Sequence, residues 1–299
     1  MNFEGFKTDK LKVSDNVEIH YGVNFSIDNI PSRPTVVFNY GLVCNIAHFK
    51  YQISYFHDQG YNVIFHDYRF HFESSSTKEI ADLSFNNICS DMNHLLHFLG
   101  VTEAFHIGHS MGVNVTLEFA RRYPTKVLGM VLISGTVLPP QDILFNTNWM
   151  DFIQPLLEDL LEKYPDLYEK FWKSGQYNPI LNYLVHKGGF NVEKVPIEFV
   201  TYYLKKIGEL SPNVFFQLLK EMKNHDIISH LENIYTNTLV MGGDKDQVIP
   251  NFLQNIISDS MPNASSYVIR DGSHVPQVDF PNSVNERIQI FFEKILAKN

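Results

Sequence analysis

The sequence has few cysteines and lacks any long apolar run. Its 299 residues include two cysteines, Cys44 and Cys89, which form no Cys-x-x-Cys pair and predict no disulfide framework. No apolar run approaches the ~18 residues needed to span a bilayer, and residues 1–14 lack the apolar core of a signal peptide. We therefore expect a cytoplasmic protein without a membrane span.

The sequence also lacks an excess of positive charge and a metal-binding pattern. Lys and Arg number 24 against 33 Asp and Glu, so the formal net charge of −9 argues against nucleic acid or an anionic membrane as a partner. Thirteen histidines form no His-x-x-x-His or Cys/His cluster of the kind that binds zinc, and His94 and His97 come nearest to one. We expect no metal and no cofactor. The composition, 44% hydrophobic and 19% charged, is that of a soluble globular chain.

The most informative feature that is present is the sequence Gly-His-Ser-Met-Gly at positions 108–112, which has the form Gly-x-Ser-x-Gly. An apolar, strand-like segment precedes it at Ala104–Ile107, and apolar residues at helical spacing follow from Val113 to Tyr123. Strand, tight turn and helix are the context of a nucleophile elbow, in which the serine hydroxyl stands clear of the sheet. Glycine on either side lets the strand and the helix approach closely. The pattern predicts that Ser110 is a nucleophile.

A serine nucleophile needs a base and a group that orients the base, and later segments offer both. The apolar strand Thr238–Met241 leads into a turn that holds Asp244 and Asp246, and the strand Ser266–Ile269 leads into His274. Both loops follow the carboxyl end of a strand, where open α/β sheets place catalytic groups. Asp246 is favoured over Asp244 by its position before Pro250, and Asp244 is the better turn former.

Two backbone N–H groups are expected to stabilise the oxyanion. One belongs to Met111, directly after the serine, and the other to Leu42, because Gly41 permits a sharp bend after the apolar strand Thr35–Tyr40. Cys44, close to this loop, is expected to be a small buried residue rather than a second nucleophile. His109 adjoins the serine, but neighbouring side chains diverge at so tight a turn, so we expect it to pack or orient rather than act as the base.

These motifs together resemble the α/β-hydrolase fold superfamily, in its capped serine hydrolase branch of esterase-like and lipase-like enzymes. Asn-Tyr-Gly-Leu at 39–42 stands where that family has a His-Gly oxyanion motif, with Asn-Tyr in place of the usual His. Residues 67–74 match the Asp-x-Arg-Gly-x-Gly-x-Ser loop in Asp, Arg and Ser, but phenylalanine replaces both glycines, at Phe70 and Phe72. His225-Asp226 and the following apolar residues resemble the return from cap to core. The resemblance implies Ser110 as nucleophile, Asp246 as acid and His274 as base.

The resemblance also implies a fold, and the order of predicted elements agrees with it. We expect an α/β protein with a mostly parallel, doubly wound sheet of about eight strands. A hairpin of Leu11–Val13 and Val17–Tyr21 opens the chain, and strands and helices then alternate as far as the strand Val127–Ser134. Besides the segments given above, the predicted elements of this alternation are a strand at 61–67 and helices at 46–59 and 82–99.

From Pro139 to Asp226 no strand is predicted and helical patterns prevail, at 149–164, 200–207 and 214–222. This stretch is rich in Phe, Tyr, Trp and Leu. The predicted organisation is therefore an α/β-hydrolase core of residues 1–137 and 227–299, with a helical cap of residues 138–226 inserted after the sixth strand. Some cap side chains are expected to pack on the core and others to line an apolar pocket above Ser110.

The predicted function is hydrolysis of a carboxylic ester or related small apolar acyl substrate through an acyl-enzyme on Ser110. Serine rather than aspartate at the elbow argues against haloalkane dehalogenase and epoxide hydrolase chemistry, which in this superfamily resembles attack by a carboxylate. Two alternatives remain open: the same three residues used to hydrolyse a C–C bond, lactone or amide or for perhydrolysis, or a ligand receptor on the same fold. The sequence carries no indication of substrate identity or oligomeric state.

Overall fold

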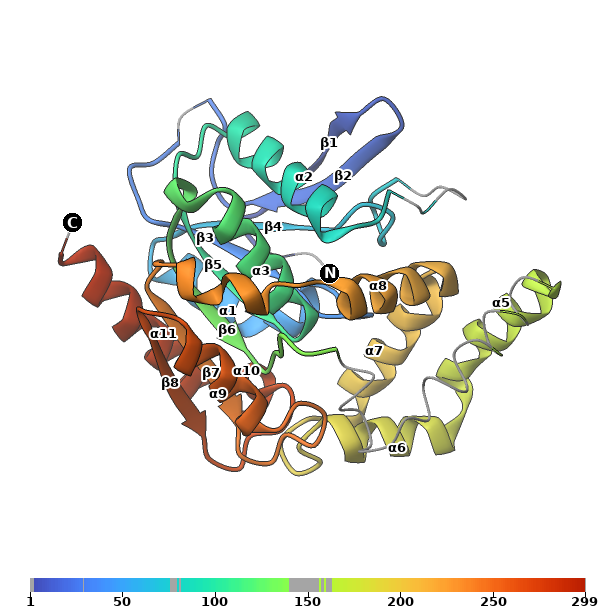
Figure 1. Cartoon of the computed structure of the whole chain (residues 1–299). Helices are drawn as coiled ribbons and strands as arrows, with labels where there is room; N and C mark the ends of the chain where they lie inside the picture. Colours follow the sequence, from blue (N-terminus) through green and yellow to red (C-terminus); the bar gives the residue numbers. More distant parts are fainter. Residues whose placement is uncertain are drawn as a thin grey trace.

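The computed structural model describes residues 3–28, 30–75, 80, 82–139, 156, 159 and 163–298. Their centre is an eight-stranded sheet with the order β1-β2-β4-β3-β5-β6-β7-β8 (Figure 1). The strands are β1 (Lys7–Ser14), β2 (Val17–Val23), β3 (Thr35–Asn39), β4 (Asn62–His66), β5 (Ala104–His109), β6 (Val127–Ile133), β7 (Thr238–Gly243) and β8 (Ala264–Ile269). From β4 to β8 all neighbours pair in parallel, while β1–β2 and β2–β4 pair antiparallel. The predicted α/β fold class is confirmed.

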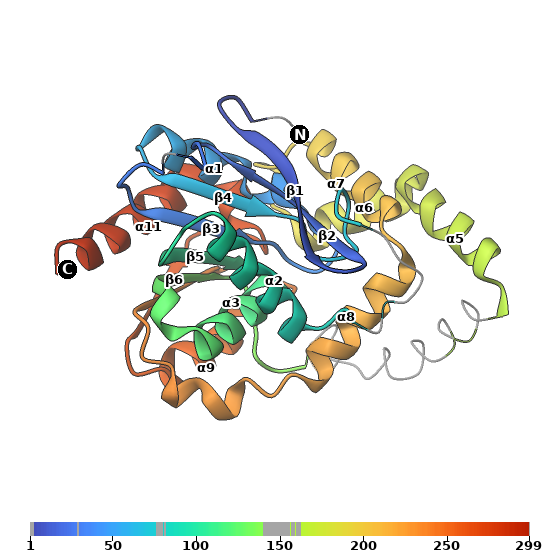
Figure 2. The same cartoon turned by 90° about the horizontal axis from the view of Figure 1, so that it is seen from above.

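The central strands are buried on both faces, as the continuous apolar runs predict for a parallel sheet. Every residue of β3, β4, β5 and β7 is buried. Two layers of helices supply the cover (Figure 2): α1 and α11 pack on each other over one face, and α2, α3 and α9 lie over the other. The helices of the core are α1 (Lys50–Asp58), α2 (Phe85–Phe98), α3 (Met111–Arg122), α9 (Asn251–Ser260), α10 (Pro276–Asp279) and α11 (Pro281–Leu296).

Two predicted helices have different boundaries in the structure because polar side chains cap them. The segment expected at 46–59 begins as a 3-10 turn, η1 (Ile46–Phe49), whose start is capped by the Asn45 side chain accepting from the Ala47 N–H at 2.9 Å. The helix expected from 82 begins instead at Phe85, since the Ser84 hydroxyl accepts from the Asn87 N–H. Such side-chain oxygens satisfy N–H groups that the first helical turn leaves without partners.

Helices α5 (Pro165–Ser174), α6 (Pro179–Gly189), α7 (Ile197–Glu209) and α8 (Pro212–Asn224) connect β6 to β7 and lie together beyond one end of the sheet (Figure 1). The predicted helices at 200–207 and 214–222 correspond to α7 and α8. The one predicted at 149–164 lies almost wholly outside the described residues. In the described part of the chain, no helix combines the length and apolarity needed to cross a bilayer.

Helices α7 and α8 belong to two different hydrophobic clusters. Apolar residues of α8, among them Val214, Leu218 and Met222, belong to the main hydrophobic core. Residues of α7 form a second, smaller cluster that includes Val275 and Val278. Because these two valines follow His274 closely, α7 packs directly against the segment that carries the predicted base.

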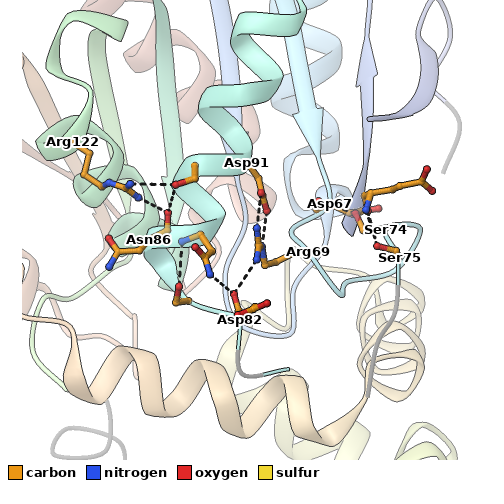
Figure 3. A network of polar contacts seen from close by, with 12 residues as sticks. Asp67, Arg69, Ser74, Ser75, Asp82, Asn86, Asp91 and Arg122 are labelled. Atoms are coloured by element: carbon orange, nitrogen blue, oxygen red, sulfur yellow. Dashed lines mark hydrogen bonds and ion pairs between the residues drawn. The ribbon is translucent and has the colours of Figure 1, made fainter. Parts of the chain in front are cut away.

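A buried ion pair ties the loop after β4 to α2. The Arg69 guanidinium donates two hydrogen bonds of 2.7 Å to the Asp91 carboxylate and a third of 3.2 Å to the Asp82 carbonyl (Figure 3). Both charged side chains are less than a tenth exposed. Burial raises the pKa of Asp91 even though Arg69 opposes that rise. Separating the pair would leave an unpaired charge in the interior, and the free-energy cost of doing so holds the loop against α2.

We expect Asp91→Ala to lower the free energy of unfolding by about 3–5 kcal/mol, because it leaves the buried Arg69 charge without a partner. Urea denaturation at neutral pH measures the loss. Glu169→Ala is the matched control, since it breaks the exposed Lys173–Glu169 pair on α5, and it should cost less than about 1 kcal/mol. Equal losses in the two variants would contradict the importance of burial.

Candidate active site

The predicted nucleophile lies at a strained turn between β5 and α3. Ser110 has φ 54° and ψ −122°, a conformation that non-glycine residues rarely adopt. A β-carbon on Gly108 would lie 2.5 Å from the Gly112 oxygen, and one on Gly112 would lie 2.1 Å from the Asn39 oxygen. Glycine is therefore required at both positions for the strand, the helix and the neighbouring β3 to approach as they do.

The structure brings the three predicted side chains into one hydrogen-bonded chain. His274 Nε2 lies 3.2 Å from Ser110 Oγ, and His274 Nδ1 lies 3.0 Å from Asp246 Oδ2. The serine follows β5, the aspartate follows β7 and the histidine follows β8. All three thus sit just beyond the carboxyl ends of parallel strands.

The surroundings of Asp246 select the tautomer of the histidine. The Asp246 side chain has no exposed surface, and its Oδ1 accepts from the backbone N–H groups of Val248 and Ile249 at 2.9 and 2.8 Å. Its Oδ2 faces His274 Nδ1, which must donate to a carboxylate. The lone pair on His274 Nε2 then faces the serine hydroxyl, which is the arrangement a general base needs. Asp244 is exposed and makes no such contact with the histidine.

The loop after β3 packs against the nucleophile. A β-carbon on Gly41 would lie 2.8 Å from Ser110 Cβ, so no other residue fits there. The Gly41 carbonyl accepts from the Cys44 N–H at 3.1 Å. In a trans peptide the N–H points opposite to the carbonyl, so the Leu42 N–H points away from Cys44. Met111 is the first residue of α3, where helical N–H groups have no intrahelical partner.

Two further histidines surround the predicted base, and both are neutral. His109 donates from Nε2 to the His274 carbonyl at 3.0 Å, and burial holds its pKa well below the usual range. The His48 ring stacks on His109 with 6.2 Å between centroids, and burial lowers its pKa to about 4. His109 therefore packs and orients, as its position beside the serine predicts, and its protonated Nε2 leaves His274 as the base within reach of Ser110.

Sequence reasoning missed the part that α7 plays at this site. The Tyr203 phenol interacts with the Cys44 thiol, and burial raises the pKa of that thiol to about 12. The Tyr203 ring also meets His48 edge-on at 5.1 Å. Cys44 is thus a buried, protonated thiol, in line with its expected packing role. Nothing in the sequence around Tyr203 distinguishes it from other apolar positions of α7.

Within the described ranges, no three His, Cys, Asp or Glu side chains are grouped so that they could hold a metal ion. The polar groups near Ser110 are instead the imidazoles and the one carboxylate described above.

Known structures share this fold. A crystal structure of a putative lipase from Acinetobacter baumannii superposes with a TM-score of 0.78 at 17% identity, covering 99% of this chain and 93% of that one. An esterase from Thermogutta terrifontis gives 0.75 at 18% identity, covering 97% and 99%. With relatives that are named hydrolases, these likenesses define the protein as an α/β-hydrolase enzyme. The chain belongs to the family described as serine aminopeptidase, S33, whose model matches residues 30–274.

Similarity to individual proteins is low but extends over most of the chain. A bifunctional esterase/perhydrolase of Acinetobacter calcoaceticus is 22% identical over 252 residues, which cover 84% of this chain and 86% of that protein. The bifunctional epoxide hydrolase 2 of Sus scrofa is 24% identical over 308 residues, which cover 95% of this chain. The chain spans only about half of that protein, 55% of its length.

We expect Asp246→Asn to lower kcat about 10⁴-fold, because an amide at this position favours the wrong tautomer of the base. Asp244→Asn is the matched control in the same turn and should leave kcat unchanged, since Asp244 is exposed. Steady-state hydrolysis of p-nitrophenyl acetate compares the two. A large loss in the Asp244 variant with none in the Asp246 variant would reverse the assignment.

Proposed function

We propose that the protein is a serine hydrolase that cleaves a carboxylic ester or related small apolar acyl compound through an acyl-enzyme on Ser110. The observation that supports this most directly is the chain of contacts from Asp246 through His274 to Ser110, with spacings of 3.0 and 3.2 Å. A buried carboxylate, an oriented imidazole and a strained, partly exposed serine are the parts that nucleophilic acyl transfer requires.

In the acylation half of the proposed mechanism, His274 Nε2 takes the hydroxyl proton as Ser110 Oγ attacks the carbonyl carbon. The carbonyl oxygen becomes an oxyanion held by the N–H groups of Leu42 and Met111, each worth roughly 3 kcal/mol of transition-state stabilisation. The C–O bond to the alcohol then breaks, and His274 returns the proton to the departing alcohol oxygen. Asp246 stays ionised throughout and stabilises the imidazolium.

Deacylation repeats these steps with water. His274 Nε2 removes a proton from water as its oxygen attacks the acyl-enzyme, and a second oxyanion forms in the same place. The bond to Ser110 Oγ breaks, and His274 gives the proton back to that oxygen. The products are a carboxylic acid and the free enzyme, and no cofactor enters either half.

The apolar character of the proposed substrate rests on what packs beside His274. Val275 and Val278 join the apolar cluster of α7, which includes Phe199 and Leu204. Phe199 also meets His48 edge-on at 5.4 Å. An acyl or alkyl group close to the serine would therefore find aromatic and aliphatic neighbours. The names of several relatives, esterase and lipase among them, agree with such a substrate.

Perhydrolysis is a second candidate, supported by the names of relatives. One is a bifunctional esterase/perhydrolase, and a non-heme chloroperoxidase of Streptomyces lividans is 25% identical over 243 residues. Here hydrogen peroxide would take the place of water in attacking the acyl-enzyme, and the product would be a peracid. Adding peroxide to the acetate ester assay and measuring peracetic acid distinguishes the two. Ester cleavage without peracid assigns simple hydrolysis.

The central prediction is that a fluorophosphonate probe labels the wild-type protein and does not label Ser110→Ala. The same substitution should lower kcat for p-nitrophenyl acetate by about 10⁴-fold or more, because no other group can form the acyl-enzyme. Ser260→Ala, at an exposed position at the end of α9, is the control and should label like the wild type. A wild-type protein that stays unlabelled and inactive would favour a ligand receptor over an enzyme.

A further inference from the structure

Two buried tyrosines join the loops that follow β3 and β4. Tyr40 comes directly after β3 and directly before Gly41, and Tyr68 lies two residues beyond β4. Their rings lie 4.3 Å apart, and neither side chain reaches the surface. The proposed mechanism gives neither residue a role, although Tyr40 occupies the place where similar hydrolases have another residue type.

The two tyrosines are linked by a reciprocal pair of hydrogen bonds. The Tyr68 phenol donates to the Tyr40 carbonyl at 2.9 Å, and the Tyr68 backbone N–H donates to the Tyr40 phenol oxygen, also at 2.9 Å. Burial raises the pKa of both phenols well above the usual range, so both keep their protons. Each bond joins the side chain of one tyrosine to the backbone of the other, which fixes the two loops together.

We call these two hydrogen bonds the Tyr40–Tyr68 clasp. The clasp lies one peptide before the proposed oxyanion hole. The Tyr40 carbonyl is held by Tyr68, and the next carbonyl, that of Gly41, is held by the Cys44 N–H. Two successive peptide planes are therefore fixed on the way to the Leu42 N–H. The Gly41 carbonyl and the Leu42 N–H belong to one planar trans peptide, so the bond from Cys44 orients that N–H directly. The bond from Tyr68 fixes the preceding peptide plane, from which the Gly41 backbone leads to Leu42.

A strained loop packs on Tyr40. Phe70 and Phe72 have φ values of 65° and 40°, in the left-handed region that glycine adopts freely and bulky residues avoid. The ring of Phe72 lies 6.2 Å from that of Tyr40, and the ring of His71 lies 6.1 Å from it. Strain retained beside a proposed active site suggests a function for the side chain that causes it, and here Phe72 packs on Tyr40.

We propose that Tyr68 is a positioning residue for the oxyanion hole: its phenol holds the Tyr40 carbonyl and thereby aims the Leu42 N–H at the developing negative charge. This inference rests on the proposed acyl-enzyme mechanism. The hydroxyl of Tyr68 acts through the backbone, so its removal should impair the transition state much more than substrate binding.

Tyr68→Phe tests the inference, because it keeps the ring and deletes only the donor. We expect kcat for p-nitrophenyl acetate to fall about 10- to 100-fold, the scale of a small misplacement of catalytic groups, with KM little changed. The rate constant for inactivation by a fluorophosphonate should fall by the same factor, since that reaction also uses the oxyanion hole. Urea denaturation, run alongside, reports any loss of stability separately.

Tyr61→Phe is the matched control. Tyr61 is also a buried tyrosine and precedes β4, at the opposite end of that strand from Tyr68. It packs on Phe56 and Phe292, between α1 and α11. This variant loses a buried phenol oxygen far from the serine, so its kcat should stay within about twofold of the wild type whatever happens to its stability.

The outcomes separate the two proposals. A reactive wild type with an unchanged kcat in Tyr68→Phe, or with a raised KM in place of a lowered kcat, overturns the positioning role alone. A wild type that reacts with neither ester nor probe overturns the proposed function and this inference with it. Should Tyr68→Phe fail to fold, Tyr40→Phe is the second test, because it removes the bond that holds the Tyr68 backbone beside Tyr40 and so loosens the position of the Tyr68 phenol. It should lower kcat at constant KM, and an unchanged kcat there overturns the inference.

Discussion

The close approach of backbone segments around Ser110 is the constraint on which the rest of the site depends. The first turn of α3 contacts the end of β3 so tightly that a β-carbon at Gly112 would overlap the Asn39 carbonyl. Gly41 meets Ser110 in the same way. The Asn39 side chain reinforces the junction by donating to Thr116 of α3 at 3.0 Å. The proposed nucleophile and the loop after β3 therefore adjoin because glycines leave no side chains between them, and the strained turn at Ser110 follows from that geometry.

Burial distinguishes His274, the proposed base, from the other histidines of the protein interior. His48, His66, His71, His106 and His109 are almost wholly buried, and burial lowers the pKa of each. His274 differs from them, because its side chain is 13% exposed and faces both a carboxylate and a hydroxyl. The buried imidazoles pack as neutral rings, each with one N–H that can donate a hydrogen bond. His109 uses that N–H to donate to the His274 carbonyl.

The features that the sequence predicts are those encoded within a few neighbouring residues. The elbow has its own glycines, and the continuous apolar runs of the buried strands indicate a parallel sheet. The approach of residues 110, 246 and 274 could be expected because successive parallel strands end at one edge of a sheet. The choice between Asp244 and Asp246 depends on which carboxylate the turn buries, and here the Val248 and Ile249 N–H groups surround Asp246.

Contacts between segments distant in the sequence could not be predicted in this way. The Tyr40–Tyr68 clasp and the Tyr203–Cys44 contact each join two loops or a loop and a helix, and no local pattern marks either partner. Helices α5 and α6 lie in the stretch for which the sequence predicts helical patterns, but no individual helix is predicted at their positions. Large apolar side chains such as Phe171 of α5 and Tyr183 of α6 are exposed there rather than packed on the core.

Helix α7 contacts both the loop after β3 and the loop after β4, and this links the proposed cap to the proposed oxyanion hole. In the first loop Tyr203 contacts Cys44, the residue whose N–H fixes the Gly41 carbonyl. In the second, the Lys206 ammonium lies 5.8 Å from the centre of the Phe72 ring, which in turn packs on Tyr40. The two positions are three apart and so share one face of the helix. We therefore expect a substitution at Tyr203 to act both on the packing of the proposed cap and on the peptides that lead to the Leu42 N–H.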